Sequence, residues 1–152
     1  QLVTKLRQSL PADWTLEAVG VSGKRNLSHS LDELFARKID WVWTQPDAGV
    51  YDASTVRALL LAALRRKVPV FGFSVAFVRA GALLGVGVSP ELQGAQAAAL
   101  TERVLKGALR ETAAEQVGIE FAVNRAAAEK LGIELAPTLL ERARYVFGWD
   151  RP

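Results

Sequence analysis

The 152-residue sequence contains no cysteine and no methionine, and His29 is its only histidine. Without cysteine, neither a disulfide framework nor a thiolate metal site is possible. A metal site would need aspartate and glutamate alone, and these residues do not cluster in the sequence. We therefore expect no metal and no cofactor. His29 stands between two serines in a polar stretch, which favours a surface position over a catalytic one.

Long apolar runs and long runs of one charge are also missing. Arg, Gly or Pro interrupts the longest apolar stretches, so no transmembrane helix is predicted. The net charge is +3, and the charges are too dispersed to indicate a nucleic-acid partner. The length of 152 residues predicts one domain, and half of the residues are hydrophobic, which disfavours disorder. The chain opens on a helical pattern without an initiator methionine, so we expect it to be a piece of a longer protein.

Motifs of catalysis are absent as well. Gly81, Gly85 and Gly87 are not followed by a helix start at the spacing of a dinucleotide fingerprint, so we interpret them as close-packing positions of a strand. Nothing around Ser74 resembles a nucleophile elbow. The polar residues at the predicted strand ends are neutral, which disfavours a receiver domain or a flavodoxin-like enzyme: Ser22, Thr44, Ser74 and Asn124. We expect recognition of a small polar ligand and no enzymatic activity.

The stretch from 68 to 88 organises the chain. It predicts a buried strand (68–73), a short helical segment (74–80) and a second apolar strand (82–88), and apolar runs without polar alternation are typical of parallel strands covered on both faces. Elsewhere, the patterns predict helices at 2–10, 28–37, 52–64, 89–107, 126–131 and 137–145, and strands at 14–21, 39–44 and 118–124. The predicted N-caps are Ser28 or Ser30, Asp52 or Ser54, and Ser89, and Gly132 is predicted to end the helix at 126–131. This alternation predicts an α/β fold: a three-layer parallel sheet flanked by helices.

In such sheets, ligands bind just beyond the carboxyl ends of the strands. The residues after the strands 39–44 and 68–73 are therefore predicted to line one concave, ligand-binding patch: Thr44, Gln45, Asp47, Tyr51, Ser74 and Phe77. A carboxylate and an aromatic ring at a strand end suit an amine that carries a flat apolar group.

Alternatives remain open for some of these residues. Asp47 is equally suited to forming a turn with Pro46 and Gly49, and Phe77 is equally suited to the core. Trp41 and Trp43 share one face of their strand, and packing against a helix is the simplest interpretation.

Five sequence blocks, in order, resemble the substrate-binding proteins of ABC uptake transporters, of the periplasmic binding protein type I class. They are Val-Pro-Val-Phe from Val68, Phe-Val-Arg-Ala-Gly-Ala-Leu from Phe77, Glu-Leu-Gln-Gly from Glu91, Val-Leu-Lys-Gly from Val104, and Val-Asn-Arg-Ala-Ala-Ala-Glu-Lys-Leu-Gly-Ile from Val123. The similarity is greatest to the group that includes tryptophan- and tyrosine-binding lipoproteins.

The resemblance implies two α/β lobes that close on a small ligand such as an amino acid. It further implies that residues 1–147 form one α/β domain, similar to the C-terminal lobe plus its return segment, and that 148–152 are a tail. Expected partners are the ligand and an ABC permease or a signalling protein, in the periplasm or cell envelope. The family's Asp-Asn pair is Asp47-Ala48 here.

The same family resemblance leads to an expectation about the oligomeric state. Residues 82–107 would return to a first lobe that this sequence does not contain, so they either fold back beside 68–73 or are exchanged with a second copy, with residues 79–81 as the hinge. We therefore expect a homodimer. The alternative function is a sensory or dimerisation domain that is derived from this fold and no longer binds a transport ligand.

Overall fold

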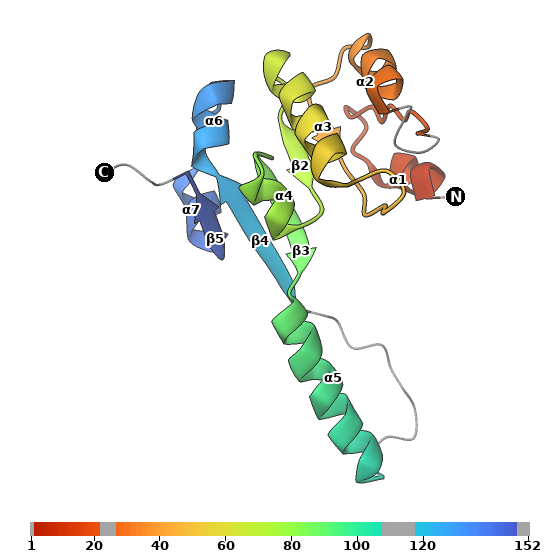
Figure 1. Cartoon of the computed structure of the whole chain (residues 1–152), viewed down its shortest axis with the longest axis vertical. Coiled ribbons are helices and arrows are strands. Elements are labelled where there is room, and N and C mark those ends of the chain that lie inside the picture. Colours follow the sequence, from red (N-terminus) through yellow and green to blue (C-terminus); the bar gives the residue numbers. More distant parts are fainter. Residues whose placement is uncertain (1, 22–26, 108–117, 149–152) are drawn as a thin grey trace.

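The computed structural model describes residues 2–21, 27–107 and 118–148. Figure 1 shows a sheet with helices around it and one long helix that extends away from the rest. In chain order the elements are α1 (Leu2–Ser9), α2 (Leu27–Phe35), β1 (Val42–Trp43), α3 (Ala53–Arg65), β2 (Val70–Gly72), α4 (Val75–Arg79), β3 (Leu84–Val88), α5 (Pro90–Leu105), β4 (Ile119–Asn124), α6 (Arg125–Leu131), α7 (Pro137–Arg142) and β5 (Tyr145–Phe147).

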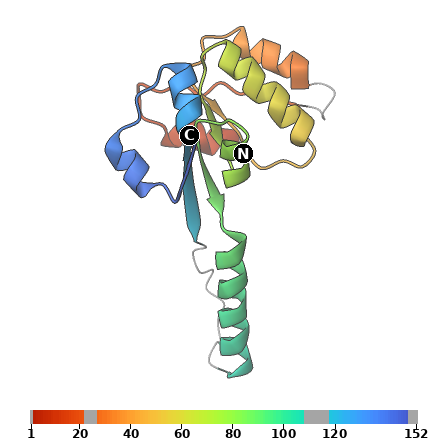
Figure 2. The ribbon, with the colours of Figure 1, turned by 60° about the vertical axis from the view of Figure 1, so that its left-hand side comes forward.

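The described strands form one five-stranded sheet in the order β1-β2-β3-β4-β5. The α/β class is confirmed, but the sheet is mixed: β3 and β4 are antiparallel, whereas the other neighbouring pairs are parallel. The reason is visible in Figures 1 and 2, where α5 points away from the sheet. A parallel return needs a connection that crosses back over the sheet. Since α5 does not cross back, the chain re-enters beside β3 in the opposite direction.

Of the two arrangements expected for residues 82–107, the structure contains the one in which the strand lies beside 68–73. Phe71 pairs with Leu84 and Gly72 with Gly85. The core lies between this sheet and its helices, and its largest fully buried apolar side chains come from α3, α4, β4 and the residue before β3: Leu59, Val78, Val123 and Leu83.

Several predicted helix ends are confirmed. Asp52 caps α3, since its carboxylate accepts from the backbone of Ser54 and Thr55, and Ser89 caps α5 in front of Pro90. Gly132, at φ 73°, ends α6 in the left-handed conformation that glycine adopts at little cost.

The predicted start of α2 is wrong. The helix begins at Leu27, so Ser28 and Ser30 lie inside it and do not cap it. The Ser30 hydroxyl instead donates to the backbone oxygen of Gly20 (3.2 Å) and joins α2 to the preceding segment.

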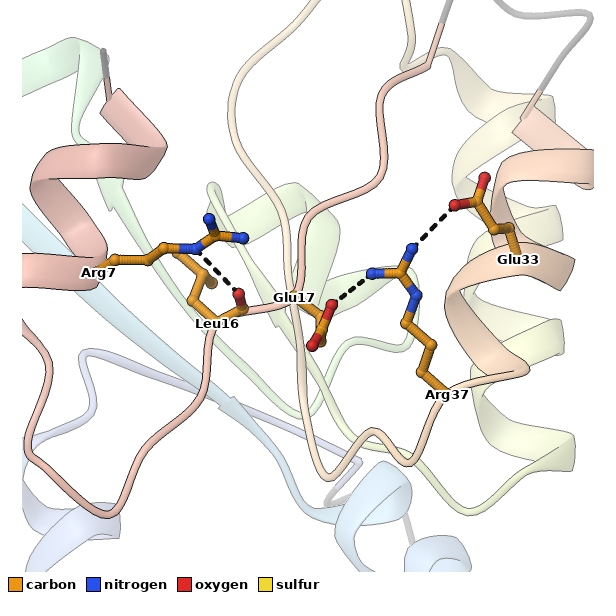
Figure 3. A network of polar contacts seen from close by, with 5 residues as sticks. All are labelled: Arg7, Leu16, Glu17, Glu33 and Arg37. Carbon is orange, nitrogen blue, oxygen red and sulfur yellow. Dashed lines mark hydrogen bonds and ion pairs between the residues drawn. The ribbon is translucent and has the colours of Figure 1, made fainter.

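The strand predicted at 14–21 is also wrong, since the described residues there belong to no strand. Side chains hold the segment instead, as Figure 3 shows. Arg7 donates to the backbone oxygen of Leu16 (3.3 Å), and Arg37 pairs with both Glu17 and Glu33. The alternating pattern indicates an extended chain, but a strand also requires a neighbouring backbone with which to pair.

Near the C-terminal end, the structure contains a strand where the sequence pattern predicted the end of a helix. The helix predicted at 137–145 ends at Arg142, and Tyr145–Phe147 form β5 beside β4. The backbone N–H of Arg144 donates to Phe121 (2.9 Å) and starts this pairing. Pairing with β4, which lies far away in the sequence, overrides the local helical pattern.

Gly85 and Gly87 are packing positions in β3, as predicted, whereas the prediction is wrong for Gly81, which precedes β3 at φ 128° and where a Cβ would lie 3.8 Å from Leu60. A Cβ on Gly85 would lie 2.7 Å from the Gly72 backbone oxygen and 2.7 Å from a Val78 methyl carbon. A Cβ on Gly87 would lie 3.1 Å from Ser74 Cα. The absence of side chains here allows α4 to lie directly on β3.

We expect Gly85→Ala to lower the free energy of unfolding by about 1–3 kcal/mol, the usual cost of overpacking a core. Gly94→Ala is the matched control, because a Cβ on Gly94 meets nothing within 4 Å. It lies inside α5, where alanine should stabilise the helix by up to about 1 kcal/mol. Urea unfolding measures both, and an equal effect of the two substitutions would contradict the packing role of Gly85.

Candidate functional site

A cavity of about 740 Å³ opens between α3, α4 and α6. Figure 1 shows α4 between the other two helices. We call this cavity the α3–α6 groove. Its outer end is formed by Tyr51, Phe73, Ser74 and Phe77. Its walls continue along α3 through Val56, Arg57, Leu60, Leu61 and Leu64, and along α6 through Ala126 and Lys130.

Three aromatic rings form the outer end. The ring centroids of Tyr51 and Phe77 are 5.6 Å apart and the rings meet edge to face, and Phe73 lies 5.5 Å from Tyr51 and 5.1 Å from Phe77. Such contacts add to the stability that burial supplies and fix the ring orientations. Phe77 is only 4% exposed. It therefore belongs to the core, as the alternative interpretation expected, and also lines the groove.

Ser74 joins this end of the groove to α4. Its hydroxyl oxygen accepts from the Phe77 backbone N–H (3.2 Å) and so caps the helix. A hydroxyl that accepts one bond still has a proton to donate. Ser74 can therefore cap α4 and donate to a ligand at the same time.

The other three predicted residues do not line the groove. Thr44 is 2% exposed, and its hydroxyl donates to the Phe71 backbone oxygen (2.9 Å) inside the sheet. Gln45 is half-buried and lies outside the groove lining. Asp47 is exposed, and one of its carboxylate oxygens accepts from the Gly49 N–H (2.8 Å) in a turn. These three residues thus lie outside the groove lining, and their part in ligand binding stays a prediction.

Asp47 still influences the groove electrostatically. The pKa of Tyr51 is raised above its ordinary value of 10.0, mainly by burial of the phenol and secondarily by the negative charge of Asp47. The two residues are also joined through the backbone, since the Tyr51 N–H donates to the Asp47 backbone oxygen (2.9 Å).

The walls of the groove include residues that the sequence patterns did not single out. Leu59, Leu60 and Leu61 are consecutive, and Leu61 is 45% exposed. Three consecutive leucines make the apolar face of α3 wider than one core contact needs, and this width was the available signal. Arg57 and Lys130 gave no signal, because charges on exposed helix faces are common.

His29 is exposed on α2, as predicted. Trp41 and Trp43 are 45% and 46% exposed, so they lie outside the core, and their packing against a helix stays a prediction. Among the residues that the structure describes, no three His, Cys, Asp or Glu side chains are grouped as a metal site would require. None of the described helices is both long and apolar enough to span a membrane.

The described residues thus form a mixed α/β sheet with a groove between α3, α4 and α6. The model of the ABC transporter substrate binding protein family matches residues 13–147, and the chain is a member of that family. No curated protein matches the chain.

Solved structures agree with this assignment. A conserved domain protein from Vibrio cholerae is 25% identical, with a TM-score of 0.62 over 83% of this chain and 42% of that one. An ABC domain from Streptococcus pneumoniae in complex with L-Trp is 23% identical, with a TM-score of 0.71 over 90% and 46%. The ligand-free, open substrate-binding protein CD0873 from Clostridium difficile is 20% identical, with a TM-score of 0.68 over 95% and 47%. The chain therefore spans less than half the length of these proteins.

The raised pKa of Tyr51 predicts a loss of stability in alkali. The folded state binds the phenolic proton more tightly than the unfolded state, so this contribution is complete below pH 10 and is lost as the pH rises through the folded-state pKa. Tyr51→Phe should abolish this loss, and Asp47→Asn should reduce it only in part, because burial is the larger cause. Urea unfolding between pH 9 and 11 (roughly the range around an ordinary tyrosine pKa) measures the effect. Identical pH profiles for the wild type and Tyr51→Phe would contradict it.

Proposed function

We propose that the chain is a ligand-recognition domain of an ABC uptake system that binds an amino acid with an aromatic or branched side chain. In this proposal residues 1–147 form one domain, similar to the C-terminal lobe and return segment of a two-lobe binding protein. The protein acts in the periplasm or cell envelope, delivers its ligand to a permease and catalyses no reaction. Family membership supports this role, because the family binds substrates.

The main support for the ligand class is the aromatic outer end of the groove beside Asp47. The rings of Tyr51, Phe73 and Phe77 offer an apolar surface to a flat side chain, and Ser74 can donate to a carboxylate. The related domain that was solved in complex with L-Trp binds a ligand of this type.

Asp47 is the residue that we propose for the ligand's ammonium group. One of its carboxylate oxygens accepts from Gly49 in the turn, and the carboxylate still has lone pairs for a ligand. The Tyr51 N–H donates to the Asp47 backbone oxygen (2.9 Å), which supports a position of the carboxylate close to the aromatic outer end. In this proposal Asp47 both forms the turn and supplies the negative charge for the ligand.

Asp47→Asn separates these two roles, because asparagine can still accept from Gly49 but carries no charge. We expect Asp47→Asn and Asp47→Ala each to weaken L-tryptophan binding by about 1.5–3 kcal/mol, the range for a hydrogen bond to a charged group. Isothermal titration calorimetry of the 152-residue chain measures the affinity. If Asp47→Asn binds like the wild type while Asp47→Ala does not, Asp47 serves only the turn and our assignment is wrong.

A second candidate function, as a dimerisation domain, is favoured by α5. Within the described part of the chain, α5 has no buried residue, and Figures 1 and 2 show it extending away from the sheet. Leu92, Val104 and Leu105 are 39%, 50% and 82% exposed. Since an exposed apolar helix invites a partner, we propose that a second copy of the chain covers α5.

We expect the 152-residue chain to be a dimer at tens of micromolar by size-exclusion chromatography with light scattering. Leu92→Glu combined with Leu105→Glu should give a monomer, because charges on the apolar helix would be buried in the interface. Leu61→Glu is the matched control, since this leucine is similarly exposed but lies on α3. A wild-type chain that stays monomeric, without aggregation, would exclude the dimer.

A further inference from the structure

The inner end of the α3–α6 groove has a composition of its own. Leu60, Leu61 and Leu64 form one wall, and two small residues, Ala76 of α4 and its C-cap Ala80, form the floor. The floor residues are exposed to solvent, and Leu61 is 45% exposed, so the described structure leaves this apolar surface open. A concave, apolar surface with a few polar groups is the usual form of a small-molecule site.

Two cations border this surface from opposite walls. Arg57 lies one turn before Leu60 and Leu61 on α3, and Lys130 lies on α6. Both are exposed, and neither takes part in an ion pair with any of the residues described here.

The described groove lining contains only one carboxylate, that of Asp52, against the two cations. Asp52 is occupied as the cap of α3, where its carboxylate accepts from the N–H groups of Ser54 and Thr55 and from the Ser54 hydroxyl. The groove therefore combines an apolar body with a positive border. A neutral hydrocarbon would leave both cations unused, and a cationic ligand would be repelled.

We propose that the inner end of the groove binds a small organic anion with an apolar body. The body lies against Leu60, Leu61, Leu64 and Ala80, and a carboxylate at its end pairs with Arg57 or Lys130. This site goes beyond the amino-acid site proposed above, because it shares no residue with Asp47, Ser74 or the aromatic rings. Its occupant is a small molecule and not a helix of a partner protein.

Decanoate is a suitable probe, with decanol and decyltrimethylammonium as its neutral and cationic counterparts. By calorimetry below the micelle concentrations, the 152-residue chain should bind decanoate about tenfold or more tightly than decanol, and the cation least. Arg57→Gln combined with Lys130→Gln should reduce the decanoate affinity to that of decanol. Equal affinity of the wild type for the acid and the alcohol would overturn the role of the two cations.

Ala80→Trp tests the location, because an indole there fills the groove from its floor. Ala58→Trp is the matched control, since Ala58 is exposed on α3 but lies outside the groove lining. We expect decanoate binding to be lost in Ala80→Trp and kept in Ala58→Trp. Retained binding in Ala80→Trp overturns the site, as does a dimer that only Ala80→Trp dissociates, because the groove would then be a protein interface.

L-tryptophan titrated into the same variants separates this proposal from the amino-acid site. Ala80→Trp should leave L-tryptophan binding unchanged, because the aromatic outer end is intact. A wild type that binds decanoate but not L-tryptophan would refute the proposed function and support the inner site. The reverse result would refute the inner site alone.

Discussion

The groove depends on one buried side chain, that of Asn124. Its amide nitrogen donates to the Val78 backbone oxygen (2.9 Å), its amide oxygen accepts from the Ala127 N–H (2.9 Å), and its own backbone N–H donates to Leu83 (2.8 Å). One residue thus joins α4, α6 and the central strands. Because Asn124 is only 7% exposed, losing any of these bonds would leave an unsatisfied polar group in the core. The floor and one wall of the groove are therefore held at a fixed separation.

What the sequence predicts well are the features with local causes. Asp52 caps α3 because its carboxylate reaches the two following N–H groups, and nothing outside that turn is needed. The packing glycines are also recognisable, since an apolar run with several glycines indicates close backbone approach. Features that depend on a distant partner are missed. Residues 14–21 have the sequence pattern of a strand, but none of the described strands pairs with them. Tyr145–Phe147 form a strand only because β4 lies beside them.

The same distinction between local causes and distant partners applies to the residues of the site. Ser74 and Tyr51 line the groove, and each follows a predicted strand closely enough for its place near the strand end to be visible in the sequence. The burial of Thr44 was not predictable from position alone, since its hydroxyl is satisfied by Phe71 of the neighbouring strand. Lys130 enters the groove only through the Asn124 contact that places α6 beside α4. An alternation of strands and helices locates the edge of a site, whereas its walls are set by tertiary contacts.

The same return of the chain explains both the groove and the uncovered helix. Since α5 extends away from the sheet, β4 re-enters antiparallel to β3 and ends at Asn124 next to α4. Had the connection crossed over the sheet, α5 would be covered, but the residue after the strand would lie at the opposite edge, far from Val78. The Asn124–Val78 contact, which positions α6 as a wall of the groove, therefore occurs together with an extended α5 whose apolar residues are not buried by the described part of the domain. In this fold, a complete groove and an exposed α5 are two consequences of one change in strand direction.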